Sequence, residues 1–239
     1  MKRFAVFDID GTLIRWQLYH AVADEFLELG FVSPSAYDSV KTARMQWKRR
    51  AAKNNFKTYE AELIRVYEEV LKNITTDQFE AAAKKVFGEY RDQTYIYTRQ
   101  LIKELKAKDY LLFAISGSQT EIVELVARHY GFDDFLGTVY ERDGQKFTGR
   151  STFYGAKKDQ ALKTLVAKHF VDFKDSIGIG DSKSDAAMMR LVDQPIAFNP
   201  DKDLFECAKA ANWKIVIERK NMVYELGSIN GKYQLVKTN

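Results

Sequence analysis

The sequence predicts an α/β protein with a mainly parallel sheet, interrupted after its first strand by an all-helical segment. Short apolar runs alternate with helical patterns along most of the 239 residues, which is typical of a parallel sheet covered by helices. Between Arg15 and about Tyr90 the strand signal disappears, and helical patterns replace it. The chain is long enough for one sizeable core domain and an insertion.

Five apolar runs of strand length are expected to form the sheet of the core. In chain order they are RFAVFDI (3–9), YLLFAIS (110–116), SIGIGD (176–181), PIAFN (195–199) and WKIVIE (213–218). Two further stretches alternate around a turn and are expected to form β-hairpins: GTVYERDGQKFTG (137–149) and VYELGSINGKYQLV (223–236). Helical patterns at 98–110 and 118–132 precede and follow the second strand.

The inserted segment contains four helical patterns, at 16–30, 33–53, 58–74 and 75–90. The second begins Ser-Pro-Ser, a capping residue followed by a proline that suits the first turn of a helix. One apolar face of the third is formed by residues at helical spacing: Tyr59, Leu63, Val66 and Val70. We therefore predict a core domain of residues 1–15 and 91–239 and a helical domain of residues 16–90.

The composition, with 46% hydrophobic and 29% charged residues, is typical of a globular protein and excludes a disordered or membrane-spanning one. No apolar run approaches ~18 residues, and the short apolar run before Asp8 cannot form the core of a signal peptide. Cys207 is the single cysteine, so neither an internal disulfide nor a cysteine-based zinc site is expected. These features predict a cytoplasmic protein, and the net charge of +4 favours anionic partners only weakly.

Polar side chains follow three of the predicted strands. Asp8 and Asp10 end the first strand, Ser116 ends the second and Asp181 ends the third. In open α/β sheets ligands bind at the carboxyl ends of the strands, so these residues are expected to meet at one site. Asp185 follows Asp181 into a helix and brings a fourth carboxylate to the same place.

Four carboxylates in one crevice repel one another unless a cation lies between them. A hard divalent cation is the usual remedy, and Mg²⁺ fits better than Ca²⁺ because few carboxylates bind directly and space remains for water and phosphate oxygens. Lys158 begins another helix and can supply a second positive charge. Ser116 begins a strand-to-helix turn whose N–H groups and hydroxyl can receive an anion.

These groups suit phosphoryl transfer, in which a carboxylate attacks phosphorus while a metal, a lysine and N–H donors stabilise the transferred group. Asp8 is the expected nucleophile. Asp10, two residues further on, is expected to protonate the leaving oxygen and then to deprotonate the water that hydrolyses the aspartyl phosphate.

Four motifs, DIDGTL, SGS, a lysine at a helix start and GDSKSD, occur in the order and spacing of the haloacid dehalogenase superfamily, which the chain resembles. The helical insertion and the tail NPDKDLFECAKAANW resemble its phosphoserine-phosphatase-like branch, subfamily IB. This resemblance implies a Rossmann-like three-layer α/β/α core and a helical cap that closes over the site. Asp10 argues against carbon–halogen cleavage, because the dehalogenases lack an acid at that position. Phosphomutases remain possible from the motifs, although nothing in the chain points to a mutase cap.

The resemblance also implies roles for individual residues. Mg²⁺ would be held by Asp8, the Asp10 carbonyl and Asp181, with Asp185 supporting the metal shell. The phosphate would contact residues from the first three motifs: Thr12, Ser116, Gly117 and Lys158. The expected enzyme is a phosphoric monoester hydrolase.

Phosphoserine is the first substrate that this branch suggests, but the chain departs from the pattern at two positions. Gln17 stands where the phosphoserine enzymes have a glutamate that meets the substrate's amino group, and an amide cannot neutralise an ammonium. Gly11 stands where they commonly have serine. We expect Gln17 to contact the substrate, and we expect the substrate to be another small polar monoester, such as an amino-alcohol, sugar or histidinol phosphate. Phosphoserine itself is the alternative substrate.

A basic stretch in the second helical pattern allows a different class of function. The stretch 41–57 carries seven basic residues and no acid: Lys41, Arg44, Lys48, Arg49, Arg50, Lys53 and Lys57. It is either a solvated helix face or a surface for a substrate with additional negative charge or a nucleic-acid backbone. The last interpretation makes the chain a polyanion-binding protein with an incidental phosphatase site. We favour the first, with a small-molecule substrate, no nucleic-acid or membrane partner, and a monomer or homodimer.

Overall fold

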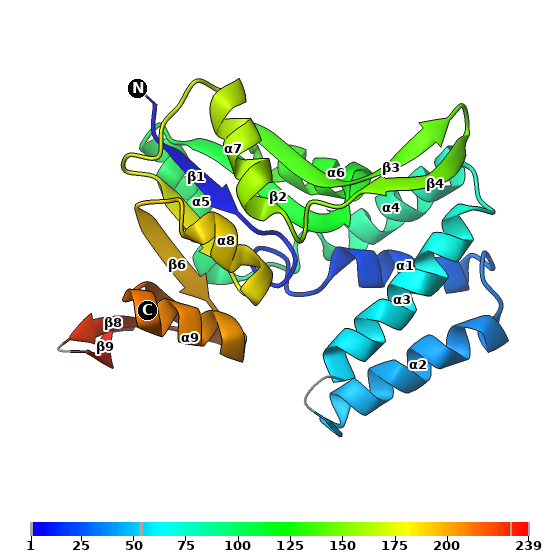
Figure 1. Ribbon diagram of the computed structural model, residues 1–239, viewed down its shortest axis with the longest axis horizontal. Helices are drawn as coiled ribbons and strands as arrows, with labels where there is room; N and C mark the ends of the chain where they lie inside the picture. The colour runs from blue at the N-terminus through cyan, green and yellow to red at the C-terminus, as the bar shows by residue number, and fades with distance from the viewer. Residues whose placement is uncertain (1, 53–54, 230, 239) are drawn as a thin grey trace. The chain divides into compact units, whose positions relative to one another are not determined.

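The computed structural model describes residues 2–52, 55–229 and 231–238 (Figure 1). Contacts divide the chain into two compact units. The core unit contains Met1–Gln17, Glu89–Thr138 and Phe153–Asn239, and the helical unit contains Leu18–Gly88 and Val139–Thr152. None of the helices in the described ranges is long and apolar enough to cross a membrane.

The sheet of the core unit has a parallel centre. Its strands are ordered β3-β2-β1-β5-β6-β7-β8-β9. Their bounds are β1 Phe4–Phe7, β2 Leu111–Gln119, β3 Asp134–Asp143, β5 Ile177–Gly180, β6 Gln194–Phe198, β7 Lys214–Arg219, β8 Met222–Ile229 and β9 Lys232–Thr238. Neighbours from β3 to β7 pair in parallel, whereas β8 and β9 add antiparallel strands. The carboxyl ends of β1, β2 and β5 therefore meet at one edge of the sheet. The sequence predicted that the polar residues after these strands would meet in this way.

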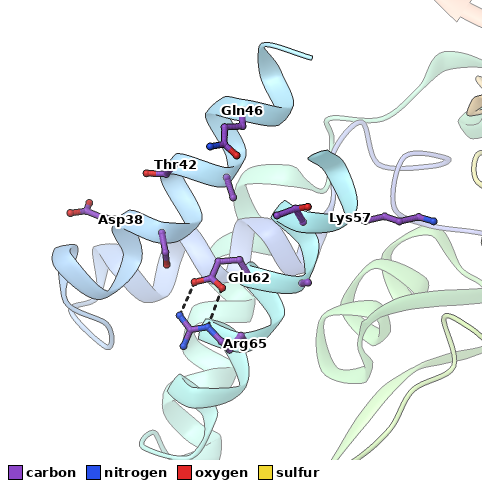
Figure 2. A pocket seen from close by; sticks show the side chains of 10 residues that line it. Asp38, Thr42, Gln46, Lys57, Glu62 and Arg65 are labelled. Carbon is purple, nitrogen blue, oxygen red and sulfur yellow. Dashed lines mark hydrogen bonds and ion pairs between the residues drawn. The ribbon is translucent and has the colours of Figure 1, made fainter. Parts of the chain in front are cut away.

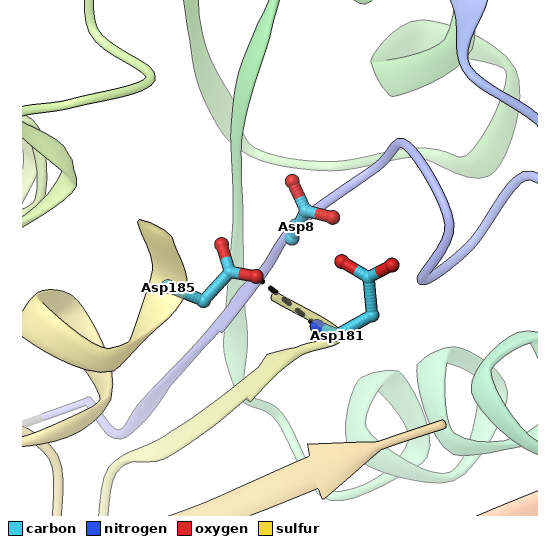
Figure 3. Close-up of side chains that lie close together, drawn as sticks. All are labelled: Asp8, Asp181 and Asp185. Carbon is cyan, nitrogen blue, oxygen red and sulfur yellow. Dashed lines mark hydrogen bonds between the residues drawn. The ribbon is translucent and has the colours of Figure 1, made fainter. Parts of the chain in front are cut away.

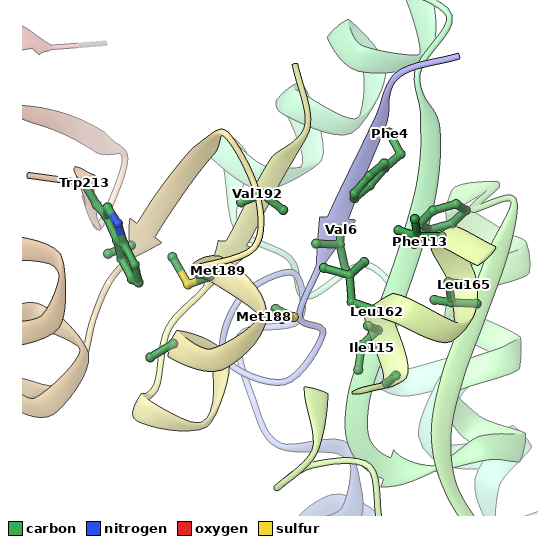
Figure 4. Packing of buried hydrophobic residues seen from close by; sticks show 14 of the residues in the cluster. Phe4, Val6, Phe113, Ile115, Leu162, Leu165, Met188, Met189, Val192 and Trp213 are labelled. Atoms are coloured by element: carbon green, nitrogen blue, oxygen red, sulfur yellow. The ribbon is translucent and has the colours of Figure 1, made fainter. Parts of the chain in front are cut away.

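Helices cover both faces of this sheet. They are α5 (Ile96–Ala107), α6 (Thr120–Tyr130), α7 (Lys158–Lys168), the short 3₁₀ turn η1 (Lys183–Asp185), α8 (Ala186–Met189) and α9 (Lys202–Ala211). Figure 1 shows α7 and α8 on one face and α5 and α6 on the other. Val6 of β1 lies in a buried cluster with Leu162 of α7 and Met188 of α8 (Figure 4). Burial of side chains of this size stabilises the fold by about 1.5–3 kcal/mol each, so this face anchors the site-bearing strand.

The helical unit contains α1 (Leu18–Glu28), α2 (Pro34–Lys48), α3 (Asn55–Leu71) and α4 (Thr76–Tyr90). As the Ser-Pro-Ser motif predicted, the Ser33 hydroxyl accepts a hydrogen bond from the Ala36 N–H at 3.2 Å, and Pro34 is the first residue of α2. The predicted apolar face of α3 is buried along its length: Tyr59, Leu63, Val66 and Val70. The amphipathic pattern thus determines which side of α3 packs inward.

Beyond Thr138, the hairpin of β3 and β4 (Lys146–Thr152) groups with the helical unit, although the sequence analysis placed it in the core domain. Arg142 donates a hydrogen bond to Glu80 of α4 at 3.0 Å. The Phe147 and Phe79 rings meet edge to face, with 5.8 Å between their centroids. Such long-range contacts leave no trace in local sequence patterns, so the predicted range 16–90 omitted this hairpin.

Candidate active site

The chain turns sharply after β1, and this turn presents Asp8 and Asp10. The Asp8 N–H still donates to the Ile179 carbonyl of β5 at 2.9 Å, whereas the Ile9 carbonyl accepts from the Ile14 N–H within the turn, also at 2.9 Å. Both aspartates are buried. The strand and the turn together hold two carboxylates at the carboxyl edge of the sheet.

Gly11 allows this turn and brings two predicted site residues close together. Its φ is +86°, and a Cβ here would lie 2.2 Å from Asp181 Oδ2 and 3.3 Å from Gln17 Nε2. A serine would therefore be strained in its backbone and would collide with Asp181. The Gln17 amide and the Asp181 carboxylate lie on the same side of Gly11, within the candidate site.

Two serines of β2 hold the Asp10 carboxylate. Ser116 Oγ donates a hydrogen bond to Asp10 Oδ2, and Ser118 Oγ donates one to Asp10 Oδ1 at 3.1 Å. The Ser118 N–H also donates to Ser116 Oγ at 2.9 Å. Ser116 was predicted from the sequence, whereas Ser118 was not. The available signal was the repeated serine of SGS, because residues two apart on a strand share a face.

Lys158 is the first residue of α7 and contacts two carboxylates. Its Nζ lies 2.6 Å from Asp8 Oδ1 and 2.5 Å from Asp185 Oδ1. Burial lowers the pKa of Lys158, but the charges of Asp185 and Asp8 outweigh burial and raise it. The other oxygen of Asp185 accepts from the N–H groups of Asp181 and Ser182 at 3.1 and 2.9 Å. Asp185 thus fixes the lysine on one side and the start of the η1 turn on the other.

Asp8, Asp181 and Asp185 form a cluster in which one carboxylate oxygen from each lies within 4.8 Å of the others (Figure 3). Burial raises the pKa of Asp8 to about 7, with Lys158 opposing the shift and Asp185 and Asp10 adding to it. Desolvation and the charges of Asp8 and Asp185 also raise the pKa of Asp181. The shared negative charge is therefore costly without a further cation.

The donor set of this cluster fits a hard divalent cation such as Mg²⁺. Every donor is a carboxylate oxygen, and Asp8 Oδ2 is buried without a hydrogen-bond partner among the described residues. Both oxygens of Asp185 already accept hydrogen bonds, so Asp8 and Asp181 are the residues that would hold the ion. The Asp10 carboxylate is bound to the two serines and does not belong to the cluster found in the described part of the chain.

The remaining predicted phosphate contacts lie in the same unit. Thr12 is fully buried, and its hydroxyl has no hydrogen-bond partner among the residues that the structure describes. Gly117 lies between the two serines of β2, and its carbonyl accepts from Thr138 Oγ1 at 2.6 Å. The sequence-predicted residues from all four motifs are thus gathered at one edge of the core sheet.

In the helical unit, Arg44 of the basic stretch belongs to a partly buried network that joins α1, α2 and α3. Arg44 Nη2 lies 2.7 Å from Asp24 Oδ1, and Arg44 Nε donates to the Tyr59 hydroxyl at 2.9 Å. The Tyr37 hydroxyl donates to Asp24 Oδ1 at 2.8 Å, and Tyr59 Oη lies 3.1 Å from His20 Nδ1. These five residues, called the α1–α3 network below, give Arg44 a structural role that the sequence did not reveal.

A groove of about 990 Å³ lies between α2 and α3 in the helical unit. Its lining carries both signs of charge, with Asp38, Lys57, Glu62 and Arg65 seen in Figure 2. Arg65 donates to Glu62 at 2.7 Å, and such exposed pairs add little to stability. The groove therefore offers no concentrated positive surface.

The other basic residues of the stretch do not converge on a site either. Lys41 lies 3.8 Å from Asp38, Lys48, Arg49 and Arg50 are exposed, and Lys53 lies outside the described residues. Separate exposed cations match the solvated helix face better than a nucleic-acid surface.

A family model described as haloacid dehalogenase-like hydrolase matches residues 5–190, which include every candidate site residue above. The chain belongs to this family. The family match extends over most of the core unit and the whole of α1 to α4, so the resemblance seen in the four motifs is confirmed.

Several curated relatives are phosphatases by name. A histidinol-phosphatase of Neisseria meningitidis is 24% identical over 226 residues, covering 90% of this chain and 99% of that protein. A phosphoserine phosphatase of Wolinella succinogenes is 26% identical over 227 residues, covering 92% and 96%. A phosphoserine phosphatase of Mycobacterium tuberculosis is 28% identical over 139 residues, covering 56% and 45%. The chain spans about half the length of the mycobacterial relatives that it matches.

Solved structures share the fold at 20% identity. A protein of unknown function from Bordetella pertussis superposes with a TM-score of 0.72, covering 91% of this chain and 99% of that one. A phospho-aspartyl intermediate analogue of phosphoserine phosphatase gives a TM-score of 0.64, covering 92% and 95%. These likenesses establish the fold of the chain.

Proposed function

We propose that this protein is a Mg²⁺-dependent phosphatase that hydrolyses a small-molecule phosphomonoester through an aspartyl-phosphate intermediate. The observation that carries the proposal is the Asp8 carboxylate, which is buried with Lys158 on one oxygen and no hydrogen-bond partner on the other among the described residues. Attack on phosphorus requires such an open oxygen beside compensating positive charge. The phosphatase names of several relatives support the same reaction class.

In the first step, an Asp8 oxygen bonds to phosphorus while the bond from phosphorus to the ester oxygen breaks. The Asp10 carboxyl gives its proton to that leaving oxygen. In the second step, a water attacks phosphorus and gives a proton to Asp10, and the Asp8–phosphorus bond breaks to release inorganic phosphate. Ser116 and Ser118 keep the Asp10 carboxylate in one orientation for both proton transfers.

The charge of the transferring phosphoryl group is balanced by groups that the core unit already positions. Mg²⁺ held by Asp8 and Asp181 would supply positive charge to the phosphoryl oxygens. Lys158 lies 2.6 Å from Asp8 Oδ1 and can contact the same group once phosphate arrives. The buried Thr12 hydroxyl, which lacks a partner among the described residues, and the Gly117 backbone complete the proposed phosphate contacts.

The class of substrate is inferred from the Gln17 side chain, which carries more weight than the names of the relatives. The Gln17 amide lies beside Gly11 and Asp181, and a neutral amide offers hydrogen bonds but no charge to an ammonium group. A small monoester other than phosphoserine is therefore the proposed substrate. A panel containing phosphoserine, histidinol phosphate, phosphocholine, sugar phosphates and nucleotides tests this. A preference above about tenfold in kcat/KM, or roughly 1.4 kcal/mol, identifies the substrate, and a preference for phosphoserine would contradict the role given to Gln17.

The reaction itself is tested with p-nitrophenyl phosphate and the variant Asp8→Asn. We expect turnover to fall by at least about 10⁴-fold, because the nucleophile is lost while the shape of the side chain is kept. The matched control Asp143→Asn removes the same charge from an exposed turn and should leave turnover unchanged. Circular dichroism checks that both variants are folded. Activity that survives Asp8→Asn or complete chelation of divalent metal would overturn the proposal.

A further inference from the structure

Phe153 is an aromatic residue next to the candidate site that no sequence motif marked. It follows β4 on the loop that leads to Lys158, and 49% of the surface of this residue is exposed. A single exposed aromatic ring is common in folded proteins, so a role for Phe153 has to follow from its contacts.

One edge of the Phe153 ring packs against two glycines. A Cβ on Gly155 would lie 2.4 Å from Phe153 Cζ, and a Cβ on Gly117 would lie 3.6 Å from Phe153 Cε2. Any side chain at Gly155 would therefore displace the ring. The two glycines also approach each other, because Gly155 Cα lies 3.8 Å from the same Cβ position on Gly117.

These two glycines belong to the two segments that carry the catalytic groups, strand β2 and the loop before α7. Gly117 is adjacent to Ser116 and Ser118, which hold Asp10. Gly155 lies three residues before Lys158, which contacts Asp8. The Phe153 ring thus lies where the end of β2 and the loop before α7 meet, beside the proposed phosphate position, and about half of the surface of this residue is exposed.

We propose that Phe153 is a specificity-determining residue whose open ring face contacts the leaving group of the substrate. The favoured substrates are phosphomonoesters whose alcohol carries an aromatic or other flat apolar group, because such a group can stack on the ring or meet its edge. This inference rests on the proposed phosphatase function and narrows its substrate class. It also agrees with the neutral Gln17 amide, since neither side chain offers charge to the leaving group.

The test compares two substrates that share the phosphoryl group and differ in the leaving group. p-Nitrophenyl phosphate has an aromatic leaving group, and acetyl phosphate has a small one that cannot reach a ring. We expect Phe153→Ala to lower kcat/KM about tenfold for p-nitrophenyl phosphate and less than about twofold for acetyl phosphate. Phe153→Tyr keeps the ring and should restore the aromatic substrate to within about twofold of the unaltered protein.

Phe170→Ala is the matched control, because Phe170 is 84% exposed on the loop after α7 and its removal tests the loss of an exposed ring elsewhere. It should change neither substrate. Equal losses for both substrates in Phe153→Ala would overturn the inference, because they would mean that the ring only supports the loops. No loss for either substrate would also overturn the inference, because the ratio of the two kcat/KM values would again be unchanged. Failure of the unaltered protein to hydrolyse either compound would instead overturn the proposed function, and the inference with it.

Discussion

The two units each bury a cluster of charged and polar side chains, and the clusters differ in how completely they are satisfied. In the α1–α3 network, Arg44 pairs with Asp24, and the hydroxyls of Tyr37 and Tyr59 bridge the charges to the three helices. In the core unit, Lys158 contacts Asp8 and Asp185, while Asp181 and Asp10 add two further carboxylates.

The pKa shifts of Arg44 in one cluster and Asp8 in the other reflect this difference. The Arg44 guanidinium has a raised pKa, because its hydrogen bond and its charge interaction with Asp24 outweigh burial, so Arg44 keeps its charge. In the core, burial raises the pKa of Asp8 to about 7, so in metal-free protein this one carboxyl is partly protonated near neutral pH. A balanced network stabilises a fold, whereas an excess of buried negative charge is retained where a cation and a phosphate can be bound.

Replacing the basic residue of each cluster should give the largest difference between the two clusters in the free energy of unfolding. Lys158→Met leaves Asp8 and Asp185 without their contact, and we expect it to lower the free energy of unfolding by about 3–5 kcal/mol in metal-free protein. Arg44→Met removes hydrogen bonds from Asp24, which is partly exposed, and from Tyr59, which is buried, and should cost about 1–3 kcal/mol. Urea unfolding with and without Mg²⁺ measures both. Mg²⁺ should reduce the difference from the unaltered protein for Lys158→Met only, and an equal effect on both variants would contradict the distinction.

Mg²⁺ alone should stabilise the protein through the core cluster. At a concentration about 100 times its Kd, a ligand that binds only the folded state adds roughly 2.7 kcal/mol, which raises Tm by several degrees in a chain of this size. Asp181→Asn should remove most of this rise. The control Asp143→Asn, with the same loss of charge on an exposed turn, should keep it. A full thermal shift in Asp181→Asn would exclude Asp181 as a ligand.

His20 provides a pH test of the α1–α3 network. Burial, with the Arg44 charge adding to it, lowers the pKa of His20 to about 3. The unfolded chain therefore binds a proton on His20 below about pH 6.5 that the folded protein does not, so the contribution of His20 to stability falls as the pH drops from 6.5 toward 3, by at most about 1.4 kcal/mol per pH unit.

We expect His20→Asn, which cannot titrate, to lose this component. The measurement is the free energy of unfolding at pH 7 and at pH 5 for both proteins. The unaltered protein should lose more stability than the variant over this interval. Identical losses would show that His20 does not remain neutral in the folded state.

The smallest effect is expected on the exposed part of the basic stretch. Replacing Lys48, Arg49 and Arg50 together by glutamine should change the free energy of unfolding by less than about 0.5 kcal/mol, because all three are exposed. Turnover of a small phosphomonoester should not change. Binding of the unaltered protein to DNA or RNA at submicromolar affinity, with a steep salt dependence that the triple variant loses, would restore the polyanion-binding interpretation.

The sequence predicted the core better than the contacts between distant segments. The five core strands were recognisable as short apolar runs between helical patterns. Polar residues follow three of them, and β1 and β5 bring Asp8 and Asp181 to the site that these polar ends predicted. The four helices after β1 followed from their 3.6-residue period. Both kinds of signal are local, so a single sequence carries them.

The features that the sequence missed depend on residues far apart in the chain. Ser118 contacts Asp10 because β2 lies beside β1, and the two residues are far apart in the sequence. The sequence indicated a surface cation at Arg44, whereas in the fold Arg44 contacts Asp24 and Tyr59. The Phe153 ring packs against Gly117 and Gly155, and glycines carry no side chain whose pattern could have predicted this contact. Local patterns do not encode these contacts.

The central claim, that Asp8 is the nucleophile of a covalent phosphoryl transfer, is tested most directly by trapping the intermediate. The variant Asp10→Asn should still accept a phosphoryl group from p-nitrophenyl phosphate, because that leaving group needs no proton, but it should hydrolyse the aspartyl phosphate slowly. Mass spectrometry of the acid-quenched protein should then find one phosphoryl group on Asp8 and none in Asp8→Asn. Steady turnover without any phosphorylated protein, or a phosphoryl group on another residue, would contradict the account.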